Sequence, residues 1–311
     1  EEVDYLLDIK NYLLKLSNII KITPMSFRNI NTELFYEVAR LPLGIIGIIV
    51  DYLSKCMLPE LLYFLPIRRV VASAILSDVN ITEAQQRHKK DIARGLGYSR
   101  CKCTSISIKP KSLKRGSKRW NILPEVIHLG DIFAFELTYK TFPEVLYMVP
   151  KIDAYFYGYD TFDPKIDANY LKNSGVNFDS LFLYEFMHVK ELPTVITSLK
   201  LIGTTLDSYV IDGLKKLSLE LSGDENTTKE YSFPSSLEDL TIKGYKLTRI
   251  TLPPNLRRLY ISTFLKSVDF VSEEMPHLEY LLLSLPDVKN LEDTGICAPN
   301  LKTQEIHNRS R

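Results

Sequence analysis

Cysteine is scarce in this 311-residue chain, which contains four cysteines and a single tryptophan. So few cysteines exclude the disulfide-dense scaffold of small secreted proteins. Cys101 and Cys103 form a lone C-x-C pair, while Cys56 and Cys297 lie far from it in the sequence. This spacing does not match that of a structural zinc site, so the sequence predicts no metal centre.

Long apolar runs and an excess of charge of one sign are also lacking. The longest apolar run, residues 41–50, contains two glycines and is too short to span a bilayer. No charged segment followed by an apolar stretch and a cleavage site opens the chain. The 39 Lys and Arg residues balance 38 Asp and Glu, which excludes a globally acidic or basic protein. We therefore expect a protein of the cytoplasm, the nucleus or both, without a membrane partner.

Signatures of catalysis are missing as well. The five histidines are scattered and none pairs with another four residues away. Neither a glycine-rich phosphate loop nor a G-x-S-x-G nucleophile motif occurs. We expect a non-catalytic protein with no cofactor and no small-molecule substrate.

A repeated pattern dominates the chain from about residue 100 onward. A six-residue unit, apolar-x-x-apolar-x-apolar, recurs ten times at an average spacing of about 22 residues. Each unit predicts one short strand whose apolar residues point into a core, which stacked neighbours bury together. The ten units begin at Cys103, Ile132, Ile152, Phe178, Ile196, Leu214, Leu237, Leu256, Leu278 and Leu301.

This pattern resembles the leucine-rich repeat family over about two thirds of the chain. The resemblance implies an α/β solenoid over residues 83–311, curved and built on a parallel sheet of short strands. The chain departs from the family pattern because the asparagine that usually follows the last apolar position is missing. The segments between units are short and often contain proline, so we expect loops and single helical turns on the convex side.

The segment before the repeats has a different pattern. Apolar residues spaced three or four apart predict an amphipathic helix over residues 1–21, followed by a linker to residue 39. Residues 34–79 carry helix-like apolar clusters punctuated by prolines, which predicts several short helices and no strands. Two interpretations remain open for this part: a docking motif for a partner protein, or a helical cap on the open end of the repeats.

The docking interpretation depends on residues 40–82. Their opening Leu-Pro, followed by the pairs Ile45-Ile46 and Ile48-Ile49, is similar to the F-box motif, although two glycines and the lack of a closing tryptophan depart from it. An F-box before leucine-rich repeats implies the substrate-recognition adaptor of an SCF-type ubiquitin ligase, of fungal type. In the alternative, the protein is a capped leucine-rich-repeat scaffold that does not bind Skp1. The resemblance implies that Skp1 contacts Leu41, Pro42, Ile45, Ile46, Ile49, Leu53, Leu58, Leu61 and Leu62.

Positive charge is concentrated in residues 87–119, which contain twelve basic residues and only Asp91 as an acid. The densest part, residues 109–119, includes glycine and two serines and predicts an exposed loop. This loop is either a solvated connection or a contact for phosphates, as in an F-box-type subunit of a DNA-binding, kinetochore-like complex. Its basic residues are Lys109, Lys111, Lys114, Arg115, Lys118 and Arg119.

Large side chains also fall between the inward apolar positions of the repeats. In the third and fourth units these are aromatic, and later units place tyrosines beside an arginine, a composition typical of binding hot spots. We expect them either to contact a protein substrate or to pack on each other or on a chain terminus. The candidate substrate-binding residues are Phe156, Phe182, Tyr184, Arg258, Tyr260 and Tyr280.

Overall fold

The chain divides into two compact units. Unit 1 comprises residues 1–128 and 133–150, and unit 2 comprises residues 129–132 and 151–311. The helix expected over residues 1–21 lies outside the described residues, as does Leu53. The computed structural model describes residues 40–52, 58–62, 65–81, 106–157, 168–185, 188–189, 192–206, 211–221, 230–244, 249–263, 268–271, 274–286 and 288–307.

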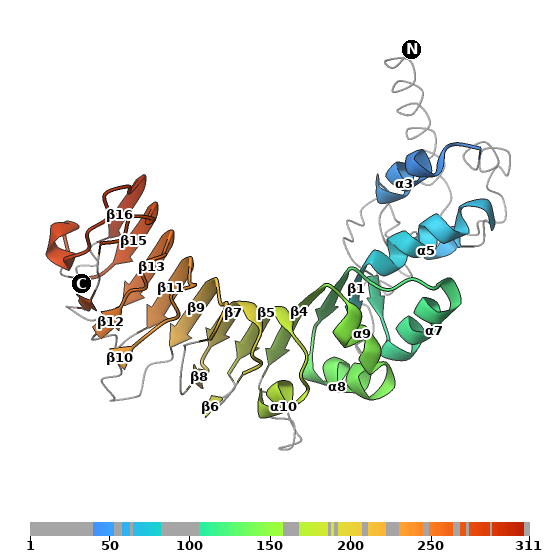
Figure 1. Cartoon of the computed structure of the whole chain (residues 1–311), viewed down its shortest axis with the longest axis horizontal. Helices are drawn as coiled ribbons and strands as arrows, with labels where there is room; N and C mark the ends of the chain where they lie inside the picture. The colour runs from blue at the N-terminus through green and yellow to red at the C-terminus, as the bar shows by residue number, and fades with distance from the viewer. Residues whose placement is uncertain are drawn as a thin grey trace, which may run out of the picture. The chain divides into compact units, whose positions relative to one another are not determined.

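A large parallel sheet is the main structural feature of the chain. Its eleven strands are β1 (Asp78–Ile81), β2 (Ile106–Ile108), β3 (Val126–Leu129), β4 (Lys151–Tyr157), β5 (Phe178–Tyr184), β7 (Ile196–Ile202), β9 (Lys216–Leu221), β11 (Asp239–Gly244), β13 (Arg258–Thr263), β15 (Tyr280–Ser284) and β16 (Thr303–His307). Their order is β16-β15-β13-β11-β9-β7-β5-β4-β3-β1-β2. From β4 to β16 the strands lie side by side in chain order (Figure 1). Together with its helices, the sheet gives an α/β architecture.

Unit 1 contains most of the helices of the described residues. They are α3 (Leu43–Tyr52), α4 (Leu58–Leu61), the 3-10 helix η3 (Leu65–Ile67), α5 (Arg68–Ser77), α7 (Pro110–Trp120), α8 (Ile132–Thr141) and α9 (Pro143–Met148), whereas α10 (Ala168–Asn173) and the 3-10 helix η6 (Glu292–Thr294) belong to unit 2. Both α3 and α4 pack on α5, which buries Val71 and Ile75 on its own side. Short helices are therefore present in residues 34–79 as expected. The expectation of no strands there is wrong, because β1 begins at Asp78.

The second repeat unit does not form a strand. Ile132 and Phe135 lie on α8, where a spacing of three residues places both on one helical face, and both are fully buried. The apolar-x-x-apolar part of the repeat pattern therefore fits a helix as well as a strand entry. The strand of this region is β3, whose alternate residues Ile127 and Leu129 are buried.

The core of unit 2 includes two rows of apolar side chains, which repeat at equivalent positions of successive parallel strands. These side chains are at most 2% exposed, and burying each leucine, isoleucine or phenylalanine among them stabilises the fold by about 1.5–3 kcal/mol. The strands predicted at the fourth to ninth repeat units are therefore present with the expected residues inward. The rows are Ala154, Leu181, Leu199, Leu217, Leu240, Leu259 and Leu281, and Phe156, Leu183, Leu201, Leu219, Ile242, Ile261 and Leu283.

The third repeat unit is a strand with the opposite facing from that expected. The pattern predicts Tyr155 and Tyr157 inward, but β4 aligns Ala154 with Leu181 and Phe156 with Leu183 of β5. Tyr155 is 46% exposed, whereas Phe156 is fully buried. Because side chains alternate along a strand, a displacement of one residue exchanges the two faces.

One of the two apolar rows ends on a polar residue at β16 and the other on a half-buried isoleucine. The pairing of β15 with β16 places Gln304 and Ile306 beside Leu281 and Leu283, and Gln304 is exposed.

In the segment between β15 and β16, the backbone N–H groups of Asn290 and Lys289 donate to the carboxylate of Asp293 at 3.0 and 3.1 Å. These hydrogen bonds lower the pKa of Asp293 below its ordinary value.

The segments that connect the repeat strands contain further short strands. β10 (Glu230–Tyr231), β12 (Arg249–Thr251) and β14 (Asp269–Val271) form a parallel three-stranded sheet, and β6 (His188–Val189) pairs with β8 (Thr205–Leu206). Loops and single helical turns were expected there. Because each connection leaves and returns at equivalent places, its backbone groups pair with those of the next connection.

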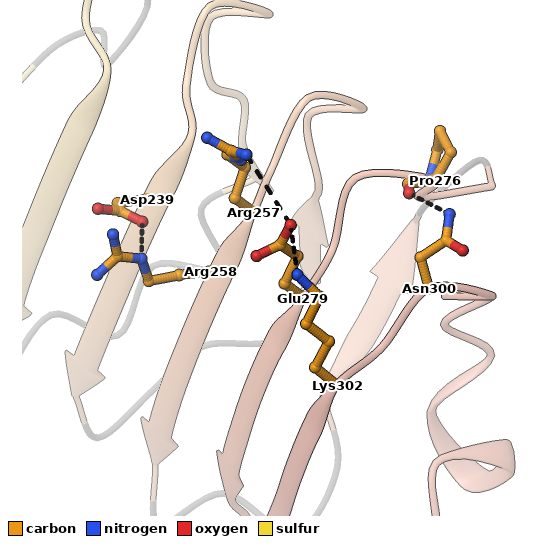
Figure 2. A network of polar contacts seen from close by, with 7 residues as sticks. All are labelled: Asp239, Arg257, Arg258, Pro276, Glu279, Asn300 and Lys302. Atoms are coloured by element: carbon orange, nitrogen blue, oxygen red, sulfur yellow. Dashed lines mark hydrogen bonds and ion pairs between the residues drawn. The ribbon is translucent and has the colours of Figure 1, made fainter.

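Charged side chains at the strand entries alternate in sign from strand to strand. Glu238 lies 3.2 Å from the Nζ of Lys215, and Glu279 lies 3.9 Å from an Nη of Arg257 and 3.1 Å from the Nζ of Lys302. Figure 2 shows the last three residues, which come from three neighbouring strand entries. Such cross-strand pairs contribute about 0.2–1 kcal/mol each, so the alternation favours this strand order.

Glu279→Lys is expected to lower the free energy of unfolding by about 1–2 kcal/mol, because two attractive contacts become repulsive. Urea denaturation at low and high salt measures the change, and Glu279→Gln is the control because it only removes the attraction. The loss in Glu279→Lys should shrink at high salt and be partly restored by Lys302→Glu. Equal free energies of unfolding for Glu279→Lys and Glu279→Gln at low salt would show that the alternating charges do not stabilise the strand order.

Candidate functional site

The face of the unit 2 sheet opposite the apolar core carries two rows of residues that are aligned across the strands. We call it the outer sheet face. Both rows begin on β4 and end on β16, so any ligand lying across the strands meets them in sequence. The rows are Asp153, Ser180, Ser198, Lys216, Asp239, Arg258, Tyr280 and Thr303, and Tyr155, Phe182, Lys200, Ser218, Thr241, Tyr260, Leu282 and Glu305.

Aromatic rings cluster at one end of this face, on β4 and β5. Phe182 packs edge-on against Tyr155 and Tyr184, with ring centroids 5.9 and 6.3 Å apart. The Nζ of Lys200 lies 5.1 Å from the centroid of the Phe182 ring, within the range of a cation–π interaction. This first aromatic cluster is thus an apolar surface with one positive charge beside it.

A second cluster lies on β13 and β15 and consists of Arg258, Tyr260 and Tyr280. The Nε of Arg258 is 3.1 Å from Oδ1 of Asp239, a contact visible in Figure 2. The Nζ of Lys243 is 5.6 Å from the Tyr260 ring centroid, and Tyr280 is 45% exposed. A hollow of about 340 Å³ opens here, and its lining includes Asp239, Arg258, Tyr260, Tyr280, Thr303 and Glu305.

One lysine and two small polar side chains separate the two clusters. In the row that joins Phe182 to Tyr260, the side chains between them are Lys200, Ser218 and Thr241. Four strand spacings separate β5 from β13, a distance of roughly 19 Å along the sheet. An extended peptide of about six residues has this length, and the serine and threonine leave its path open.

Five of the six candidate substrate-binding residues lie on the outer sheet face. Phe182, Tyr184 and Tyr260 are half-buried, and Arg258 and Tyr280 are exposed. The prediction for Phe156 is wrong, because this ring lies in the core with its centroid 6.5 Å from that of Phe178. Tyr155, which the sequence reasoning assigned to the core, takes its place on the exposed face. The strict alternation of Ile152, Ala154 and Phe156 was the signal that could have shown this.

The residues proposed from the F-box resemblance divide into two groups. Ile46, Ile49, Leu58 and Leu61 are buried in unit 1, so the expectation that they contact a partner is wrong for this conformation. These apolar positions fill the core formed with α5. Pro42 is exposed, and Leu41, Ile45 and Leu62 are half-buried. Sequence reasoning missed the most exposed apolar residues of this part, Leu43, Ile48 and Leu65.

The basic residues expected in a loop lie on a helix. In α7, Pro110 occupies the first turn, where its missing N–H is not needed, and Asn121 ends the helix in a left-handed conformation with φ 51°. Pro110, Leu113 and Ser117 form the buried face. Lys114 is half-buried and its Nζ donates to the carbonyl of Thr141 at 2.6 Å. Exposed positions are Lys109, at the N-cap, and Lys111, Arg115, Lys118 and Arg119.

Other types of site are not found in the described residues. They contain no group of three or more His, Cys, Asp or Glu side chains placed to hold a metal ion. None of the helices within these residues is long and apolar enough to cross a membrane. In comparisons with known protein families, with curated proteins and with solved structures, nothing matches the chain.

Proposed function

We propose that this protein is the non-catalytic substrate-recognition adaptor of an SCF-type ubiquitin ligase. In this proposal unit 2 is a leucine-rich-repeat solenoid that binds a protein substrate, and the F-box-like segment binds a Skp1-like adaptor. The observation that carries it is the pair of aromatic clusters on the outer sheet face, joined by a row of Lys200, Ser218 and Thr241.

The outer sheet face supports protein binding for a physical reason. Tyrosine, phenylalanine and arginine on an exposed surface supply most of the energy of protein interfaces, because they bury large areas at low entropic cost. The clusters at Phe182 and Tyr260 are about one extended hexapeptide apart. An extended substrate segment would thus place an anchor side chain on each cluster while its backbone crosses Ser218 and Thr241.

The exposed part of α3 supports the partner in the second half of the proposal. Leu43 is 69% exposed and Ile48 is 48% exposed, and Pro42 precedes them on the same segment. Leu65, at the start of η3, is 71% exposed. Exposed apolar side chains of this size fit a hydrophobic groove on a partner protein that binds several aliphatic residues. The adaptor would therefore contact this exposed set in place of the buried Ile46 and Ile49.

Co-purification of the full chain with Skp1 tests the proposal. We expect a stable 1:1 complex that the double variant Leu43→Asp, Ile48→Asp loses, because two charges would replace apolar anchors. Met148→Asp is the matched control, since Met148 is 62% exposed in the same unit and lies outside the segment.

The control variant should bind Skp1 like the original protein, and both variants should keep the original circular dichroism spectrum. Lack of a complex with the folded original chain would rule out the ligase adaptor. The burial of Ile46, Ile49, Leu58 and Leu61 would then support the second interpretation, a capped repeat scaffold.

A further inference from the structure

Helix α7 presents positive charge that is not balanced within the helix. Its sequence contains five basic residues and no acidic residue. Lys111, Arg115 and Lys118 are spaced four and three residues apart, so they share one face of the helix and extend over roughly 10 Å of its axis. In the part of the chain that the structure describes, no ion pair joins these three side chains to an acid.

Among the described residues, the neighbouring elements do not neutralise this face. Lys114 contacts the last residue of α8, Thr141. The acidic residue of α8 is Glu136, and it forms an ion pair with Lys140. At the other end of α7, the Arg119 guanidinium lies 5.2 Å from the Trp120 ring centroid, which holds this charge at the helix surface. The exposed face therefore attracts anions along its whole length.

We propose that this exposed face of α7 binds the phosphate backbone of a duplex nucleic acid. A duplex carries about one negative charge per 1.7 Å of its axis, so several phosphates are available over the length of the helix. The contact is independent of base sequence, because lysine and arginine side chains on phosphates carry no base readout.

The composition of the face argues against other partners. A helix that lies on a membrane exposes apolar residues, whereas Pro110 and Leu113 are buried and Trp120 is half-buried. An acidic peptide would gain most of its binding energy from a few side chains buried in packed pockets. The exposed positions of α7 are basic or serine, which favours a partner of dense and regular charge. This inference does not depend on the proposed function, since α7 shares no residue with α3 or with the outer sheet face.

Fluorescence anisotropy of a 20-base-pair DNA duplex and of an RNA duplex with the full chain tests the inference, at 50–200 mM salt. With Lys111, Arg115, Lys118 and Arg119 engaged, the slope of log Kobs against log salt concentration should be about −3.6. The variant Lys111→Gln, Arg115→Gln, Lys118→Gln should bind at least tenfold more weakly, with a slope less steep by about 2.7. The two duplexes show which nucleic acid is preferred.

The matched control is Lys151→Gln, Lys215→Gln, Lys302→Gln, which removes the same charge from three ion-paired lysines of unit 2. Its affinity should stay within twofold of the original. Equal losses in the two triple variants, or no duplex binding at 50 mM salt, would overturn the inference. Displacement of the duplex by polyglutamate at equal total charge would indicate that α7 binds an acidic protein. Binding only to phosphatidylserine vesicles would indicate a membrane, and either result would also overturn the inference.

Discussion

Replacing Phe156 with alanine is expected to lower the free energy of unfolding by about 3–5 kcal/mol. The ring is fully buried and packs edge-on against Phe178 on the next strand, so its removal leaves a cavity between β4 and β5. Urea denaturation followed by circular dichroism measures the loss.

The neighbouring residue provides the control. Tyr155 is 46% exposed on the opposite face, so Tyr155→Ala should change the same free energy by less than about 1 kcal/mol. The two substitutions remove rings of similar size one residue apart, and they separate the two possible registers of β4. A larger loss from Tyr155→Ala than from Phe156→Ala would show that the tyrosines face inward.

The second large effect is expected in α3. Ile49→Asp should cost several kcal/mol, because Ile49 is 3% exposed and the carboxylate would lack a partner among the apolar side chains of the core. Ile48→Asp, one residue earlier and 48% exposed, should change stability by about 0.5 kcal/mol or less.

Hydrogen exchange of the α3 and α5 backbone amides provides the local measurement, since both helices pack together in unit 1. Ile49→Asp should speed exchange in both helices, and Ile48→Asp should leave the rates nearly unchanged. The opposite ranking would mean that α3 turns its other face to α5. The comparison also bears on any partner assay, because loss of binding in an Ile49 variant would report unfolding of the helix.

The later repeats are predictable from sequence because leucine and isoleucine occupy the inward positions and polar residues the outward ones. In the third unit Tyr155, Phe156 and Tyr157 are all aromatic, so these three residues alone do not select the face, and only the alternation of Ile152, Ala154 and Phe156 indicates it. The second unit fails for a related reason, since a three-residue spacing is common to helix faces and to the repeat entry. Pairing of β4 with β5 fixes the facing of the third unit in the structure.

Helix α7 escapes sequence prediction because its buried face is small. Only Leu113 and Pro110 are apolar there, and Ser117 supplies the third buried position, so the periodicity is weak. In residues 41–50 the buried face could not be predicted for the opposite reason: nearly every residue is apolar, so no polar face identifies the solvent-exposed side of the helix. The second aromatic cluster could be predicted from the sequence, since the repeat register aligns Arg258 with Tyr280. The hollow around this cluster could not, because it depends on where the side chains lie.

The exposed polar residues of β16, the last strand in the order, have a consequence for self-association. A parallel sheet that ended on leucines would offer a second molecule both free backbone groups and an apolar surface, which is how edge strands nucleate aggregates. At β16 the incoming strand would instead meet Thr303, Gln304 and Glu305, all exposed. Burying the Gln304 amide and the Glu305 carboxylate without partners is unfavourable. The exposed polar residues of the last strand in the order therefore disfavour end-to-end joining of two copies through this edge.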